Sequence, residues 1–159
     1  MGFGMYLLIL SIKEKKKKIY ATVGGLFYMF NPYMMVQIWH RFNNTSFFFV
    51  ASIPFLIIFW KGWIKSGNYL NLLYFLLVNL LSSYMFGTLA FVVPFWLIIS
   101  LLTISEICFP WENKYHLSKI LWRALLGLGM WIVVNSWWLI PVATIGSGVT
   151  SQQHNIGES

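Results

Sequence analysis

The chain has 159 residues, of which 58% are hydrophobic, 19% aromatic and only 9% charged. About a quarter of the residues of a soluble protein are charged, so this composition excludes an ordinary water-soluble domain and favours a protein of the lipid bilayer. The net charge of +7 comes from short basic breaks between apolar runs, which indicates membrane topology rather than a nucleic-acid-binding face.

The first apolar stretch is too short to cross a bilayer unaided. As a helix, residues 1–12 would be about 18 Å long, whereas the hydrocarbon core is about 30 Å thick. We therefore expect an N-terminal hydrophobic stub. The first basic break follows it, with Lys13 and Lys15 to Lys18 close together.

Five later stretches are long and apolar enough to be predicted as full spans. They cover residues 19–39, 47–64, 69–84, 88–108 and 120–143. Together with the stub they make residues 1–143 an all-α, polytopic transmembrane helix bundle. Residues 144–159 are rich in Gly, Ser and Gln and are expected to form a disordered polar tail outside the cell.

The basic residues predict the orientation of the chain. Beyond the first break they form a second cluster, Lys61 and Lys65, and a third, Lys114, Lys119 and Arg123. Five spans place all three clusters on one side, and the positive-inside bias makes that side cytoplasmic. The prediction is a multi-pass protein of the cell membrane with an extracytoplasmic C-terminus and the lipid bilayer as its partner.

Tryptophan and asparagine have separate expected roles in these spans. Most tryptophans fall near predicted helix ends, where we expect the rings to anchor the chain at the membrane interface: Trp39, Trp60, Trp63, Trp111, Trp122, Trp137 and Trp138. The polar residues inside the spans are expected to hydrogen-bond between helices: Asn31, Gln37, Asn71, Asn79 and Asn135. Apart from residues near the span ends such as Glu106 and Arg123, the spans carry no Asp, Glu, Lys or Arg, which disfavours an ion-coupled transporter.

Recognised catalytic and metal-binding patterns are missing from the sequence. His40, His116 and His154 lie on loops that alternate between the two sides, so no metal site of this chain alone is expected. The chain contains no serine nucleophile elbow and no phosphate-binding glycine loop.

Two short motifs and one loop carry a family resemblance. The basic loop after Lys13 is followed by a helix that runs into Phe30-Asn31-Pro32-Tyr33, and the last span ends in Trp137-Trp138-Leu139-Ile140-Pro141. This order resembles the central part of polytopic GT-C glycosyltransferases, especially those similar to the arabinofuranosyltransferases of cell-envelope assembly. The resemblance implies a helical platform that holds a polyprenyl-phosphate sugar near the outer leaflet.

The resemblance places the catalytic acidic residues of the family on the first extracytoplasmic loop, which this sequence does not contain. The chain has no Asp, and its four acidic residues are Glu14, Glu106 and Glu112 on the predicted cytoplasmic side and Glu158 in the tail. We therefore expect a fragment, or one subunit of a split enzyme, with no catalytic residue and no cofactor of its own. A divalent metal would need acidic ligands from a missing N-terminal segment or companion subunit.

The substrate-binding candidates under this hypothesis are Asn31, His40, Arg41, Trp137 and Trp138. Arg41 could bind the donor phosphate, since a guanidinium offers paired donors to phosphate oxygens, or it could be an interfacial charge that snorkels. The alternative functions are a non-catalytic membrane scaffold or assembly subunit and, third, a small-solute transporter.

Overall fold

The computed structural model describes residues 2–11, 17–36, 44–83, 89–108 and 117–157. Every regular element in these ranges is a helix, so the predicted all-α class is confirmed for this part of the chain. The elements are α1 (Gly2–Leu10), α2 (Lys17–Met29), α3 (Pro32–Val36), α4 (Asn44–Ser66), α5 (Tyr69–Leu81), α6 (Leu89–Cys108) and α7 (Leu117–Gly157).

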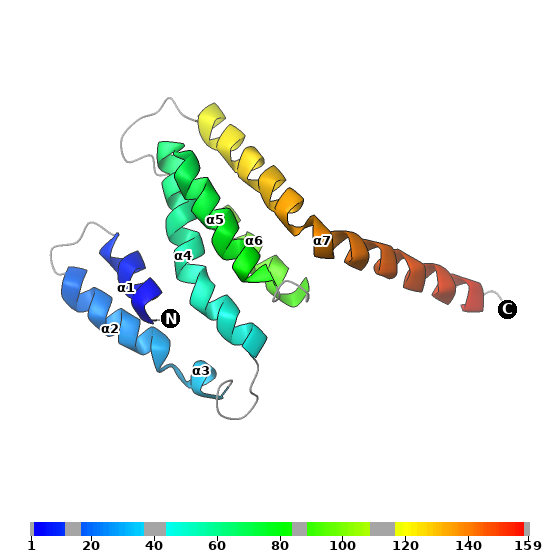
Figure 1. Ribbon diagram of the computed structural model, residues 1–159, viewed down its shortest axis with the longest axis horizontal. Helices are drawn as coiled ribbons and strands as arrows, with labels where there is room; N and C mark the ends of the chain where they lie inside the picture. The colour runs from blue at the N-terminus through cyan, green and yellow to red at the C-terminus, as the bar shows by residue number, and fades with distance from the viewer. Residues whose placement is uncertain (1, 12–16, 37–43, 84–88, 109–116, 158–159) are drawn as a thin grey trace.

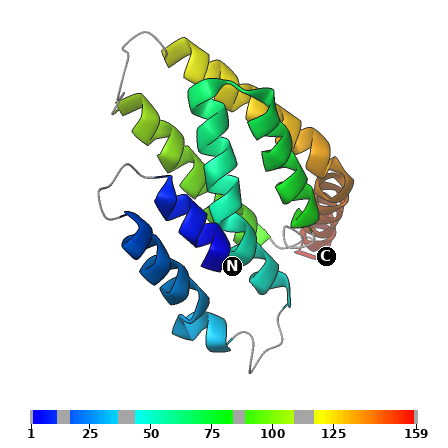
Figure 2. The ribbon, with the colours of Figure 1, turned by 60° about the vertical axis from the view of Figure 1, so that its left-hand side comes forward.

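The long helix α4 is the centre of the bundle. It contacts α1, α5, α6 and α7, while α2 packs against α1. Figures 1 and 2 show α2 and α3 on one side of α4 and α7 on the other. The N-terminal segment and the last helix are therefore separated by α4.

Helix length supports fewer spans than the sequence predicted. Within the residues that the structure describes, two stretches are long and apolar enough to cross a membrane, Phe48–Ser66 in α4 and Leu117–Thr144 in α7. The apolar stretches Tyr69–Leu81 and Val92–Cys108 are shorter. The 13 residues of α5 make only about 20 Å of helix. In the described part of the chain, length and composition thus support two of the five predicted spans.

The predicted span 19–39 is interrupted. α2 ends at Met29 and α3 begins at Pro32, while residues 37–39 lie outside the described ranges. Proline disfavours helical backbone in the residue before it and suits the first position of a new helix. The Asn31-Pro32 pair therefore divides the span.

The polar tail also differs from the expectation of disorder. α7 continues through Pro141 to Gly157, 41 residues in all, or about 60 Å of helix. Its C-terminal part extends beyond the other helices (Figure 1). One proline removes only one backbone donor, and the Thr144 hydroxyl adds hydrogen bonds to the Ile140 and Pro141 carbonyls, at 3.1 and 3.0 Å.

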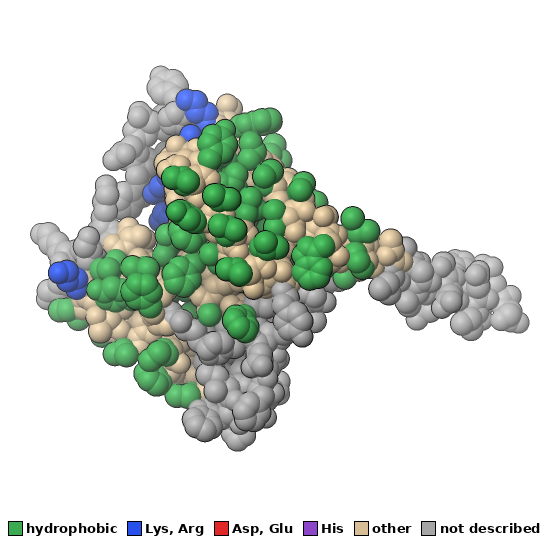
Figure 3. Space-filling view, viewed as in Figure 1, with side chains coloured by type: hydrophobic (Ala, Val, Ile, Leu, Met, Phe, Trp, Pro, Cys, Tyr) green, Lys and Arg blue, Asp and Glu red, His purple; other side chains and the backbone are tan. Residues whose placement is uncertain are grey.

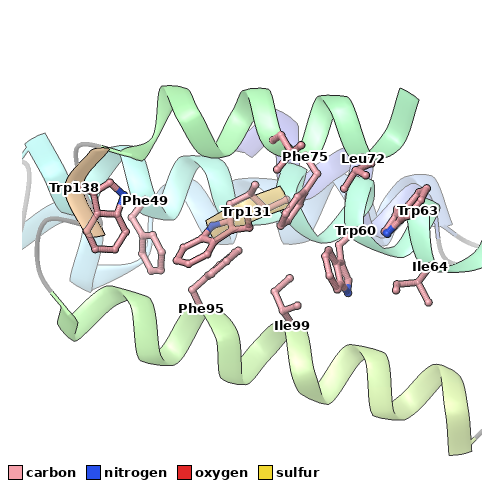
Figure 4. Packing of buried hydrophobic residues seen from close by; sticks show 12 residues of the cluster. Phe49, Trp60, Trp63, Ile64, Leu72, Phe75, Phe95, Ile99, Trp131 and Trp138 are labelled. Atoms are coloured by element: carbon pink, nitrogen blue, oxygen red, sulfur yellow. The ribbon is translucent and has the colours of Figure 1, made fainter. Parts of the chain in front are cut away.

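Aromatic side chains fill the core between α4, α5, α6 and α7 (Figure 4). Trp60, Trp63, Trp131 and Trp138 are each at most 5% exposed. The Trp131 ring meets those of Trp96 and Trp138 edge to face, with centroids 5.1 and 6.2 Å apart, an arrangement that aromatic quadrupoles favour.

This packing corrects the expected role of three tryptophans. Trp60, Trp63 and Trp138 were predicted to anchor at the interface, but they are buried by neighbouring helices. Trp122 and Trp137 are 67% and 57% exposed, as interfacial anchors would be. Trp39 and Trp111 lie outside the described residues.

Candidate functional site

The break between α2 and α3 contains Asn31, the first of the predicted binding residues. Pro32 has no N–H, so the Tyr28 carbonyl loses the partner that a continuous helix would supply. The Asn31 side chain donates to that carbonyl, with Nδ2 2.9 Å from the oxygen. The Asn31 side chain therefore caps the C-terminus of α2, which is a structural role for its amide group.

A second proline is compensated by the same turn of α2. Pro54 lies inside α4 and frees the carbonyl of Val50, four residues earlier. The Tyr28 hydroxyl donates to this oxygen at 2.6 Å. Membrane helices tolerate proline when a neighbour satisfies the freed backbone group, and here α2 does so for α4.

The remaining predicted binding residues are not brought together with Asn31. Trp137 and Trp138 lie within α7, on the opposite side of α4 from the α2–α3 break (Figures 1 and 2). Trp137 is exposed, whereas Trp138 is buried and donates its indole N–H to Asn135 at 2.9 Å. His40 and Arg41 lie outside the described residues.

A buried polar network joins α5 to α7. Asn135 donates to the side-chain oxygen of Asn79 at 3.1 Å and to the Trp131 carbonyl at 2.9 Å, and its own oxygen accepts from Trp138. Both asparagines are fully buried. The predicted interhelical role of Asn79 and Asn135 is confirmed, and this network accounts for the buried position of Trp138.

The C-terminus of α4 is capped by a charged side chain from α7. The Arg123 guanidinium donates to the carbonyls of Ile64 and Lys65 at 2.7 and 3.0 Å, which belong to the last, unpaired turn of α4. In return, the Trp63 indole N–H donates to the Arg123 carbonyl at 3.0 Å. A cation here also opposes the negative end of the helix dipole.

The turn after α4 leaves room for this arginine. Gly67 has φ of +68°, a left-handed conformation that glycine adopts without strain. A Cβ at this position would collide with the guanidinium of Arg123. Asn68 then starts α5, since its side chain accepts from the Leu70 N–H at 3.0 Å.

Lysines and one carboxylate extend this basic end toward α6. Glu106 lies 3.7 Å from the Lys61 ammonium and 3.3 Å from that of Lys65. Figure 3 shows the visible Lys and Arg side chains along one edge of the molecule. Sequence reasoning grouped these residues by charge but missed the arginine cap, because the carbonyls that it binds belong to another helix.

The described residues offer little acid–base or metal chemistry. Glu106 is the sole carboxylate in the described ranges, and it is paired with two lysines. Within the same ranges no three His, Cys, Asp or Glu side chains gather as a metal site requires. No protein-family model, curated protein or solved structure matches the chain.

Proposed function

We propose that the chain is a multi-pass membrane protein whose helices form a platform, without catalytic activity of its own. The distribution of exposed side chains carries this proposal. Large apolar residues are exposed on α2, α5 and α7 alike, among them Phe27 at 72%, Leu81 at 82% and Val133 at 66%. Soluble proteins rarely expose apolar surface on this scale, whereas lipid chains would cover it.

The proposed topology keeps five spans, with the shorter helices completed by flanking residues or by local thinning of the bilayer. Its basic end is cytoplasmic by the positive-inside bias. The location is the cell membrane, with the C-terminal end of α7 outside. The support is that Lys61, Lys65 and Arg123 gather where α4 ends and α7 begins, and that the Lys and Arg side chains visible in Figure 3 lie along one edge of the molecule.

The narrower proposal follows the resemblance to GT-C glycosyltransferases. The platform would hold a polyprenyl-phosphate sugar near the outer leaflet, and a missing segment or companion subunit would supply the acidic residues and any metal that they bind. One feature in its favour is the break at Asn31-Pro32, which places one of the shared motifs at a helix end away from the basic side. Trp137, exposed on α7, is the described candidate for contact with the donor.

A plain assembly scaffold is the second candidate. The polar groups of α5 and α7 support it, because their hydrogen bonds are made within the bundle. The Asn135 side chain is bonded to Asn79, to the Trp131 carbonyl and to the Trp138 indole. Such hydrogen bonds serve helix packing. Under this proposal the exposed apolar faces would pack against lipid and other subunits.

Donor binding separates the two candidates. The purified chain in lipid nanodiscs would be mixed with a radiolabelled polyprenyl-phosphate pentose, and both bound label and sugar transfer would be measured. We expect bound label and no transfer. Trp137→Ala should weaken binding, whereas Trp122→Ala, which removes another exposed tryptophan from the basic half of α7, should not.

Each outcome has a defined meaning. If the unmodified chain binds no label, the proposal of a donor-binding platform is refuted and the assembly scaffold remains as the candidate function. Transfer by the chain alone would refute the view that its carboxylates are insufficient. Equal loss of binding in both tryptophan variants would refute the assignment of Trp137.

A further inference from the structure

We infer that the basic end of α4, α6 and α7 is a binding site for the phosphate headgroup of an anionic phospholipid. This inference rests on the proposed membrane location. The described site contains four cationic side chains and one carboxylate, a net charge of +3: Lys61, Lys65, Lys119, Arg123 and Glu106.

The cations in this cluster are not equally available. Arg123 is committed to the carbonyls of α4. Lys61 and Lys65 share the single carboxylate of Glu106, so one unit of positive charge stays uncompensated between them. Lys65, with 49% of its side chain exposed, is the more accessible of the pair.

Lys119 adds a second available cation close by. It lies four residues before Arg123, on the same face of α7, and Arg123 reaches the backbone of Ile64 and Lys65. Lys119 is exposed. Lys65 and Lys119 therefore flank the capped end of α4 and can bind a phosphate together.

Aromatic rings at the same level favour a lipid over a free anion. Tyr69 is 71% exposed and its ring centroid lies 5.3 Å from that of Trp63, which is bonded to Arg123. Trp122, next to Arg123, is 67% exposed. Exposed Tyr and Trp partition to the headgroup region, so these rings mark where acyl chains end and headgroups begin.

Native mass spectrometry of the full chain tests the site. The protein would be released from neutral detergent with equal amounts of phosphatidylglycerol and phosphatidylcholine, and the ratio of bound to lipid-free protein measured for each lipid. We expect preferential retention of phosphatidylglycerol. Lys65→Gln and Lys119→Gln should each weaken it about fivefold, since a basic residue contributes roughly 1 kcal/mol to anionic-lipid attraction.

Lys18→Gln is the matched control. It removes one charge from the N-terminal part of α2, away from the cluster, and should change phosphatidylglycerol binding less than twofold. Equal losses in all three variants would show diffuse attraction and overturn the site. Circular dichroism must show the same helix content in each variant, which excludes misfolding as the cause of a loss.

Two further experiments test separately whether the ligand is a lipid and whether the chain is a membrane protein. Inorganic phosphate at 10-fold excess over the lipid should not displace phosphatidylglycerol, and displacement would overturn the assignment to a lipid. Insertion of the chain into nanodiscs made of phosphatidylcholine alone tests the membrane proposal separately. Insertion without lipid preference would refute this inference and leave the proposed function standing.

Discussion

Tyr28→Phe should destabilise the bundle because the Tyr28 hydroxyl replaces a hydrogen bond that Pro54 removes. The hydroxyl lies 2.6 Å from the Val50 carbonyl oxygen, and Pro54 has no N–H with which to satisfy that oxygen. An unsatisfied acceptor costs about 1–3 kcal/mol when it is fully buried, whereas this bond is partly buried; interhelical hydrogen bonds in membranes contribute about 0.6–2 kcal/mol. We therefore expect a loss of about 1–2 kcal/mol in the free energy of unfolding.

A double-mutant cycle with Pro54→Ala isolates the proposed cause. Alanine restores the N–H that can bond to Val50 within α4, so Tyr28→Phe should cost less than about 0.5 kcal/mol in that background. The expected coupling of about 1 kcal/mol lies within the measurable range of such cycles. Unfolding in mixed detergent micelles with increasing dodecyl sulfate, followed by circular dichroism, supplies the four free energies.

Tyr20→Phe provides the control for loss of a hydroxyl on the same helix. Tyr20 is 54% exposed, and such surface changes usually stay within about 0.5 kcal/mol. Equal costs for Tyr28→Phe with and without Pro54 would refute the reasoning, because the hydroxyl would then contribute independently of the freed carbonyl.

Three further predictions use the same unfolding assay. Arg123→Gln should lower the free energy of unfolding by about 2–4 kcal/mol, because charged hydrogen bonds to the α4 carbonyls contribute about 1.5–3 kcal/mol each. A decrease of less than about 0.5 kcal/mol would contradict the role of Arg123 as a cap of α4. Gly25→Ala should destabilise more than Gly24→Ala, since the new Cβ would lie 2.9 Å from a backbone oxygen of α1 in the first case and meet only the flexible end of a side chain in the second. Asn135→Leu should cost more than Asn79→Leu, because Asn135 takes part in three of the network's hydrogen bonds and Asn79 in one; the reverse order would contradict the network.

Local sequence patterns predicted the helical elements and some of their ends. Apolar stretches of sufficient length predicted the helices α4 to α7, whose bounds differ by a few residues except at the C-terminus of α7. The break at Pro32 lay within a predicted span, although the Asn-Pro pair signals it. The continuation of α7 past Pro141 was missed because polar composition alone does not exclude a helix.

Tertiary contacts set the limit of prediction from the sequence. Trp60 and Trp122 both lie near predicted helix ends, yet one is buried and the other exposed, because neighbouring helices decide which face of a helix is covered. Similarly, nothing near Tyr28 in the sequence indicates that Val50 accepts its hydrogen bond, 22 residues away. Of the predicted binding residues, Trp138 is buried and bonded to Asn135, and Asn31 donates to the Tyr28 carbonyl at the end of its own helix; the sequence predicted neither partner.

The central claim is that α4 crosses the membrane with its lysine-rich end in the cytoplasm. Single cysteines in place of Asn43, which precedes α4, and of Ser66, its last residue, would be introduced after Cys108→Ser and treated with a membrane-impermeant maleimide on intact cells. We predict labelling of Asn43→Cys in intact cells and of Ser66→Cys only after permeabilisation. Labelling of both positions from the same side would contradict the account.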